Sequence, residues 1–145
     1  MKSFKKVAAL LLVVSMFSSL LAVEAGATTI SPMDATSSTE VKLTTTSTTQ
    51  TITWPVASGY GYWKIAITNT STADLTVRIL KGSPSGTAVF SDRVNANSTL
   101  SFYAEDGSPL AAGAYYIIVQ SAKSDVNLKG TLWYKFGSSH ADINN

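Results

Sequence analysis

A stretch of alternating bulky residues, residues 110–121, constrains the fold of this chain more than any other feature. It opens on a turn that ends at Gly113 and continues with Tyr115, Ile117 and Val119 at alternate positions. The intervening positions hold another tyrosine, another isoleucine and a glutamine, so an extended strand presents bulky side chains to both faces. Such a strand is predicted to lie in the middle of a sheet, with the rest of the chain as its partners.

Shorter alternating runs recur along the chain, each bounded by turn residues. The other predicted strands start near residue 40 and cover residues 50–54, 62–69, 75–80, 87–92, 100–102 and 128–136. Pro55 is expected to close the second of them. About eight short strands with frequent turns, and no helical periodicity beyond the first 27 residues, predict an all-β fold. We expect an antiparallel β-sandwich that is jelly-roll-like rather than a closed barrel.

The first residues carry an export pattern. Three lysines precede an apolar run over residues 7–23, and the small residues Ala25, Gly26 and Ala27 follow. A transmembrane anchor is the alternative, but the run is short for a span and contains three serines. Residues 1–27 are therefore predicted to be a secretory signal peptide, and the protein is expected outside the cell or at a bacterial cell surface.

Removal of that segment changes the charge balance. It takes away three of the eleven basic residues and one of the nine acidic residues, which leaves eight of each. A neutral chain lacks the basic excess that attracts nucleic acid or anionic lipid, so neither is expected as a partner after cleavage. The chain contains no cysteine, which excludes disulfides, thiol chemistry and cysteine-ligated metals. Stability must come from one packed core.

The remaining chain divides into three parts. Residues 28–39 form a Thr/Ser-rich segment that is either a linker or an extended arm, residues 40–136 form the sandwich, and residues 137–145 are expected to be a loose tail. An arm over residues 36–49 offers a strand to a neighbour's sheet, or forms the domain's own first strand.

Four segments together resemble a known family: residues 63–67, 75–80, 110–119 and 130–134. Their order and apolar positions resemble the bacterial pre-peptidase C-terminal domain, a secreted jelly-roll module often attached to extracellular proteases. The resemblance covers roughly residues 50–136 and implies that fold and an accessory role. Relatives in bacterial collagenases bind collagen and calcium. However, the segment before the first predicted strand lacks the acidic cluster of a calcium site, so no ligand is carried over.

Groups for catalysis are scarce. The single histidine, His140, lies beyond the last predicted strand, where a base or metal ligand would have no rigid support. Glu105 and Asp106 are adjacent, which suits a turn better than a carboxylate pair for hydrolysis. A weak calcium contact from Asp106 stays open as an alternative. We expect no enzyme activity and no cofactor.

The aromatic residues are the remaining candidates for a binding site. Trp54 and Trp63 are expected first of all in the core, whereas Trp133 has the opposite phase to its apolar neighbours, so either it or they face outward. Tyrosines on a sheet surface give rigid contact area at low entropy cost, unless they pack beneath loops. The predicted ligand-binding residues are Tyr60, Tyr62, Tyr103, Tyr116 and Trp133.

Two hypotheses of function follow from these features. The first is a secreted, non-enzymatic binding or adhesion module for an extracellular polysaccharide or protein surface. The second is a self-assembling subunit of an extracellular fibre or biofilm matrix, whose arm adds a strand to another copy.

Overall fold

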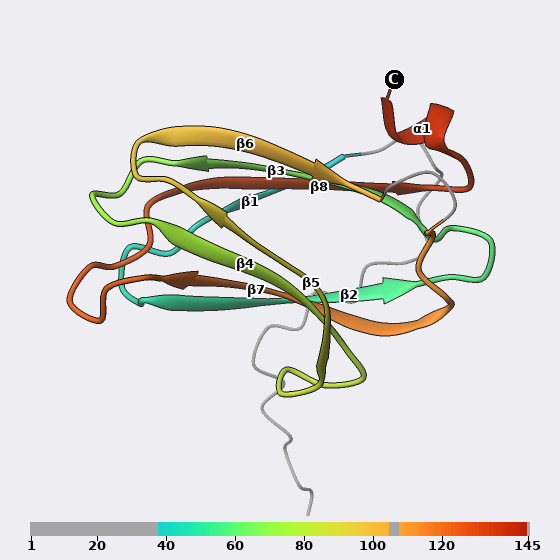
Figure 1. Cartoon of the computed structure of the whole chain (residues 1–145), viewed down its shortest axis with the longest axis horizontal. Helices are drawn as coiled ribbons and strands as arrows, with labels where there is room; N and C mark the ends of the chain where they lie inside the picture. Colours follow the sequence, from blue (N-terminus) through green and yellow to red (C-terminus); the bar gives the residue numbers. More distant parts are fainter. Residues whose placement is uncertain (1–37, 105–107, 145) are drawn as a thin grey trace, which may run out of the picture.

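The computed structural model describes residues 38–104 and 108–144. The predicted signal peptide, residues 28–37 of the predicted arm, Glu105 and Asp106 lie outside the described residues. Eight strands account for most of the described chain (Figure 1). They are β1 (Thr39–Lys42), β2 (Thr49–Val56), β3 (Tyr62–Asn69), β4 (Leu75–Lys81), β5 (Thr87–Val94), β6 (Ser98–Tyr103), β7 (Gly113–Ser121) and β8 (Gly130–Gly137).

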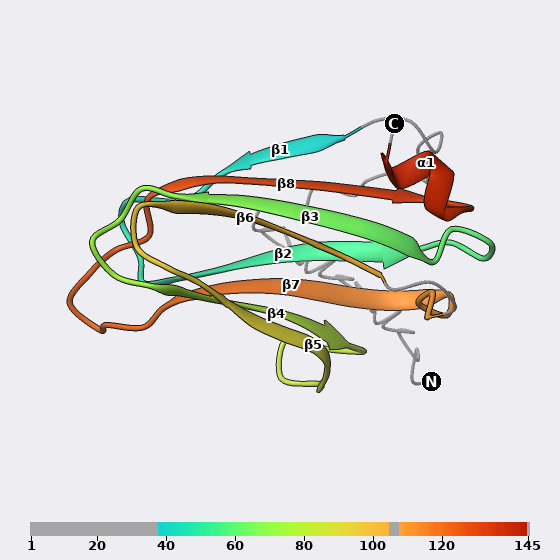
Figure 2. The ribbon, with the colours of Figure 1, turned by 45° about the horizontal axis from the view of Figure 1, so that its top comes forward.

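The strands form two four-stranded sheets that lie face to face (Figure 2). The strand orders are β1-β8-β3-β6, here called the β8 sheet, and β2-β7-β4-β5, here called the β7 sheet. Every neighbouring pair is antiparallel. Consecutive strands change sheet at every step except from β4 to β5, which is the connectivity of an eight-stranded jelly roll. The predicted fold class is confirmed.

The strand predicted to be central has that position. β7 lies between β2 and β4, and the side chains of Tyr115, Ile117 and Val119 are buried between the sheets. On the outer face of the same strand Ile118 is buried as well, while Tyr116 is half-buried. The bulky side chains that the alternation predicts on both faces of this strand are therefore buried or half-buried on both sides of the β7 sheet.

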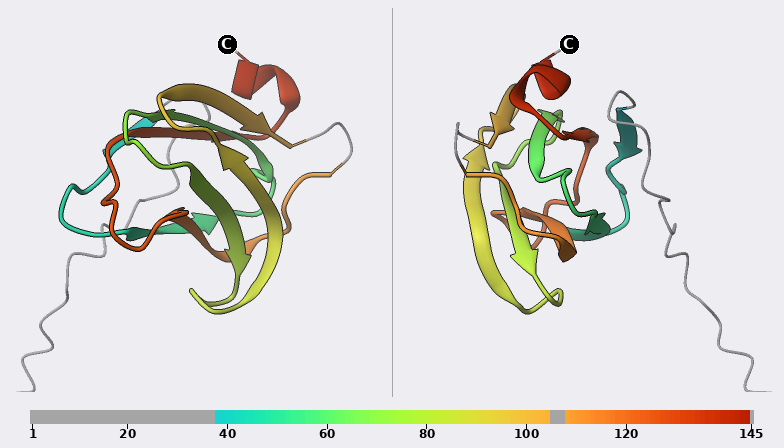
Figure 3. Two further views of the ribbon diagram at one scale, coloured as in Figure 1. Left: turned by 60° about the vertical axis from the view of Figure 1, so that its left-hand side comes forward. Right: turned by 90° about the vertical axis from the view of Figure 1, so that its right-hand side faces the viewer.

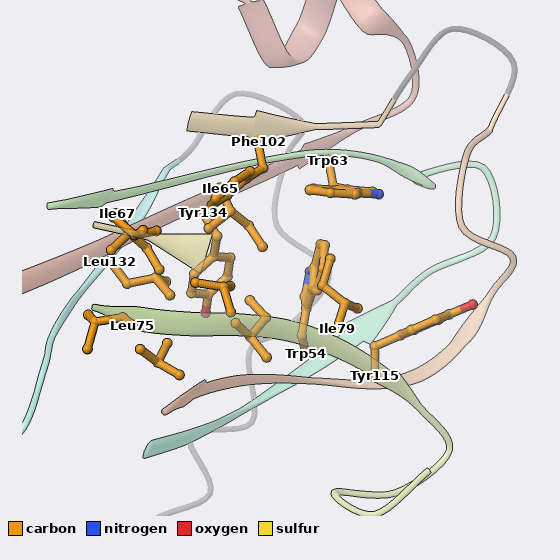
Figure 4. Close-up of a cluster of buried hydrophobic side chains, with 14 of the residues drawn as sticks. Trp54, Trp63, Ile65, Ile67, Leu75, Ile79, Phe102, Tyr115, Leu132 and Tyr134 are labelled. Atoms are coloured by element: carbon orange, nitrogen blue, oxygen red, sulfur yellow. The ribbon is translucent and has the colours of Figure 1, made fainter. Parts of the chain in front are cut away.

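The core is centred on Trp54, whose side chain has no exposed surface. Figure 4 shows its ring between the sheets, below Trp63 and beside Tyr134. The ring centroids of Trp63 and Tyr134 lie 6.3 and 6.2 Å from that of Trp54, within the range of favourable aromatic pairs. Phe90 of the edge strand β5 lies 5.1 Å from Trp63, so one aromatic cluster joins both sheets. Trp54 and Trp63 are core residues, as expected.

One detail of the strands differs from the prediction. Pro55 does not close the second strand but lies inside β2, opposite Ala114 of β7. β2 is the edge strand of its sheet, and an edge strand tolerates a proline because some of its N–H groups have no neighbouring strand to bond. Residues 39–42 form β1, the strand predicted to start near residue 40, and pair with β8 of the same chain, so this part of residues 36–49 is the domain's own first strand.

The expected loose tail is partly a helix, and this prediction was wrong for the residues that the structure describes. Gly137 ends β8, and α1 (His140–Asn144) follows on the outer face of the β8 sheet (Figure 3). Ser139 and Asp142 form a capping box, in which each side chain bonds the other residue's backbone N–H. Ile143 is 1% exposed, so the helix is docked.

In the part of the chain that the structure describes, no helix has the length and apolar character needed to cross a bilayer.

Candidate functional site

The outer face of the β8 sheet brings together side chains from strands that are far apart in the sequence. Trp133 of β8 lies opposite Ala66 of β3. Two residues further along β8, Lys135 lies opposite Lys64, which in turn lies opposite Tyr103 of β6. Directly opposite side chains in an antiparallel pair are close neighbours, with Cβ atoms about 5 Å apart. Tyr103, Lys64 and Lys135 therefore form one row across this part of the face, and Trp133 lies in the row two residues away.

Two aromatic side chains on this face are largely accessible. Tyr103 is 54% exposed and Trp133 is 49% exposed. Their positions are two strands and two residues apart, which places their backbones about 12 Å from each other. A single exposed apolar residue is ordinary, but two large aromatics on one sheet face form a surface of the kind that contacts other molecules.

The helix α1 covers one end of this face. Its Ile143 packs down against the sheet, and its His140 ring stands edge-on to Tyr62 and Tyr103, 6.5 Å from each ring centroid. Gly137 makes this docking possible, because a Cβ atom at this position would lie 2.6 Å from the Cβ atom of Asp142. The chain thus turns back over β8 at a residue without a side chain.

The Asp142 carboxylate holds the start of α1 in place. Its Oδ2 atom accepts hydrogen bonds from Ser138 Oγ at 2.7 Å, and from the backbone N–H groups of Ser138 and Ser139 at 3.0 Å each. These bonds, with that of Ser138 Oγ first among them, hold the pKa of Asp142 below its ordinary value. The carboxylate stays ionised in mildly acidic solution, and the helix stays capped.

A pocket of about 240 Å³ lies between α1 and the sheet. The described residues around it include two aromatic residues, of which only Trp133 is exposed, together with two lysines and Ile143 of the helix. They are Ser38, Lys64, Ala66, Trp133, Tyr134, Lys135 and Ile143. The volume is below the ~300–1,000 Å³ of typical small-molecule sites, so the pocket suits one small group of a longer ligand.

The structure divides the five predicted binding residues. Tyr62, Tyr103 and Trp133 share the outer face of the β8 sheet. Tyr116 lies on the outer face of the other sheet, opposite Leu80, and Tyr60 packs against the core from the β2–β3 loop. The neighbours Leu132, Tyr134 and Phe136 are buried in the core, and Trp133 itself faces outward.

Lys64, Lys135 and Ile143 were not among the residues predicted for the site. The pattern Ser139-His140-Ala141-Asp142 matches the sequence signature of a capping box, and it could have revealed the helix that carries Ile143. No comparable signal exists for the two lysines, because their pairing depends on the register of β3 and β8.

Of the residues considered for catalysis, the structure describes only His140, which lies on α1 beside two tyrosine rings. Across residues 38–104 and 108–144, no three His, Asp or Glu side chains come together in a group that could hold a metal ion. The open alternative of a calcium contact from Asp106 falls on a residue outside the described ranges.

The described chain is thus an eight-stranded jelly roll with exposed aromatic side chains on one outer face. No protein-family model and no curated protein matches the chain. Among solved structures, the pre-peptidase C-terminal domain of collagenase from Bacillus anthracis is similar, with 20% identity and a TM-score of 0.45 over 72% of this chain and 90% of that domain. The resemblance predicted from the sequence is thus found again, at the level of fold.

Two other similar structures belong to different kinds of protein. A protein of the Bacillus endospore appendages, a family of disulfide-linked pili, is 18% identical with a TM-score of 0.40 over 74% of this chain and 94% of that chain. The module CsCBM6-3 from Clostridium stercorarium, solved with cellobiose, is 18% identical with a TM-score of 0.39, covering 76% and 92% of the two chains. These are likenesses of fold, and no function is taken from them.

Proposed function

We propose that this protein is a secreted, non-enzymatic binding or adhesion module that contacts an extracellular polysaccharide or protein surface through the outer face of the β8 sheet. The observation that carries the proposal is the pair of exposed aromatic side chains, Trp133 and Tyr103, on one sheet face beside a pocket. The predicted signal peptide over residues 1–27 supports a place outside the cell.

The face has the physical properties that binding requires. Strands hold side chains more rigidly than loops do, and aromatic rings lose little rotamer entropy when they are covered. Trp133 and Tyr103 each expose about half of a side chain that buries ~150–250 Å² when covered, or roughly 100 Å² per ring. At ~25 cal/mol per Å², covering both rings contributes about 5 kcal/mol.

That sum limits the affinity. Association costs at least ~4 kcal/mol in lost translational and rotational freedom, so the two rings alone give weak binding. Useful affinity therefore requires polar contacts beside the rings, or several sites along a repeating ligand. A polysaccharide or a fibrous protein offers such repeats, which is why an extended polymer suits this face better than a small free molecule.

Retention on insoluble polymers tests the proposal. The exported chain would be passed over cellulose, chitin, peptidoglycan and collagen, together with the Trp133→Ala and Tyr103→Ala variants. We expect retention on at least one polymer and a loss of about tenfold or more in each variant. Tyr116→Ala is the matched control, because that ring lies on the other sheet and its loss leaves the face intact. Absence of retention on all four, or equal loss in the control, would refute the proposal.

The second hypothesis, a self-assembling fibre subunit, now depends on residues 28–37, because residues 39–42 already belong to the chain's own β8 sheet. Size-exclusion chromatography and negative-stain microscopy of the exported chain discriminate the two. Filaments that disappear after deletion of residues 28–37 would favour the fibre subunit. A monomer that is retained on a polymer would favour the binding module.

A further inference from the structure

The pocket beside Trp133 combines an aromatic ring with two cationic side chains, and this combination indicates the charge of its ligand. We propose that it binds an acidic sugar, a uronic acid unit of a polysaccharide, whose ring lies on Trp133 and whose carboxylate lies at Lys64 and Lys135. This inference rests on the proposed function and names the substrate class of the same face.

The spacing of the three side chains fits such a unit. Trp133 and Lys135 are two residues apart on one strand and point to the same face, so their positions are about 7 Å apart. Lys64 is directly opposite Lys135, and both line the pocket. A uronic acid carries its carboxylate on a ring carbon, so one unit reaches the lysines while its ring covers the indole. A glycerol phosphate chain has the charge but no ring to stack.

The surrounding residues set the direction in which the unit lies. Glu40 of β1 is opposite Trp133, on the side of β8 away from Lys64. Its carboxylate disfavours an acidic group on that side, and the two ammonium groups favour it on the other. Ile143 closes the far wall of the pocket with apolar surface, which suits the C–H face of a sugar ring rather than a second charged group.

The attraction is local. After removal of residues 1–27 the chain carries eight basic and eight acidic residues, so there is no overall positive field that would draw in every polyanion. Lys64 and Lys135 are both half-buried, and salt screens such pairs less than fully exposed ones. Binding should therefore weaken with added salt without disappearing, and it should depend on these two lysines rather than on the lysine content of the chain.

Affinity electrophoresis separates this inference from non-specific attraction. The gels contain either polygalacturonate or its fully methyl-esterified form, which has the same sugar and linkage but no charge. We expect the exported chain to be retarded at least tenfold more strongly by polygalacturonate. The double variant Lys64→Met, Lys135→Met should lose about tenfold in affinity for polygalacturonate, and Trp133→Ala should lose binding to both polymers.

The matched control removes two lysines elsewhere. Lys81 and Lys129 are exposed and do not line the pocket, so the double variant Lys81→Met, Lys129→Met should bind polygalacturonate as the unchanged chain does. An equal loss in both double variants would overturn the inference, since it would show attraction by net charge. Equal retardation by both polymers, abolished by Trp133→Ala, would overturn the acidic-sugar inference and leave the proposed binding module intact. Retardation by neither polymer would overturn the inference, and retention on the four insoluble polymers then decides the proposed function.

Discussion

Replacing Gly137 by alanine tests how the helix α1 is docked on the outer face of the β8 sheet. Gly137 does not have a positive φ angle, so alanine is compatible with its backbone. The added Cβ atom, however, would lie 2.6 Å from the Cβ atom of Asp142, well inside van der Waals contact. The neighbouring atom belongs to the capping residue of the helix, so relief of the clash displaces α1 from the sheet.

The magnitude follows from what the helix buries. Displacement exposes Ile143, which is 1% exposed in the folded protein, at a cost of about 1.5–3 kcal/mol. A helix of five residues does not persist without such packing, so α1 unfolds rather than shifts. Alanine also restricts the unfolded chain, which returns about 0.4–1 kcal/mol. We therefore expect Gly137→Ala to lower the free energy of unfolding by about 1–2 kcal/mol.

Urea unfolding measures that loss, and the methyl NMR signals of Ile143 report the helix directly. We expect these signals to move to random-coil positions while circular dichroism keeps its β-sheet form. Gly59→Ala is the control: Gly59 has a φ angle of 85° and no atom within 4 Å of the added carbon, so alanine strains the backbone without touching α1. Unchanged Ile143 signals in Gly137→Ala would refute the reasoning.

Three further predictions concern the core and the acid range. Asn69→Ala should cost about 2–4 kcal/mol in urea unfolding, because the buried amide donates to the Ala73 and Asn95 carbonyl groups and accepts from Ser71. Trp54→Phe should cost at least ~1 kcal/mol less than Trp54→Ala in the same assay, since phenylalanine leaves the smaller cavity in the core and the Nε1–H group, which both variants remove, has no hydrogen-bond partner among the described residues. The pKa of Asp142 is lowered in the folded protein, so the stability that its carboxylate contributes is complete above the ordinary aspartate pKa of ~3.9 and is lost as the pH falls through the folded pKa. In an NMR titration, the Ile143 signals should therefore change only below about pH 4. No change down to pH 2 would contradict this prediction.

The strands could be predicted from the sequence because buried and exposed side chains alternate along them. β3 and β4 have the predicted limits within one residue, since every second side chain is buried from Trp63 to Asn69 and from Leu75 to Ile79. The turn before β6 was also predictable: Asn97 has a φ angle of 52°, a conformation that asparagine tolerates better than most residues. Local alternation and turn chemistry were enough for these elements.

The site was less predictable, because its parts meet only in three dimensions. Tyr62 and Tyr116 each lie on the side of a strand opposite to its buried residues, yet they are on the outer faces of different sheets. Alternation states which side of a strand a residue occupies, but not which sheet holds the strand. α1 is too short to show helical periodicity, and only its capping box marks it.

The jelly-roll connectivity itself explains how this face is assembled. Consecutive strands change sheet at almost every step, so outward side chains on neighbouring segments of the sequence point away from each other. A surface on one sheet must then be built from β3, β6 and β8, which do not follow one another in the chain. β8 is the last strand and lies inside its sheet, so a segment that turns back at Gly137 meets the outer face of that sheet. The final helix is thereby placed where it walls the pocket, and a change at Gly137 should alter binding without touching a ligand-contacting side chain.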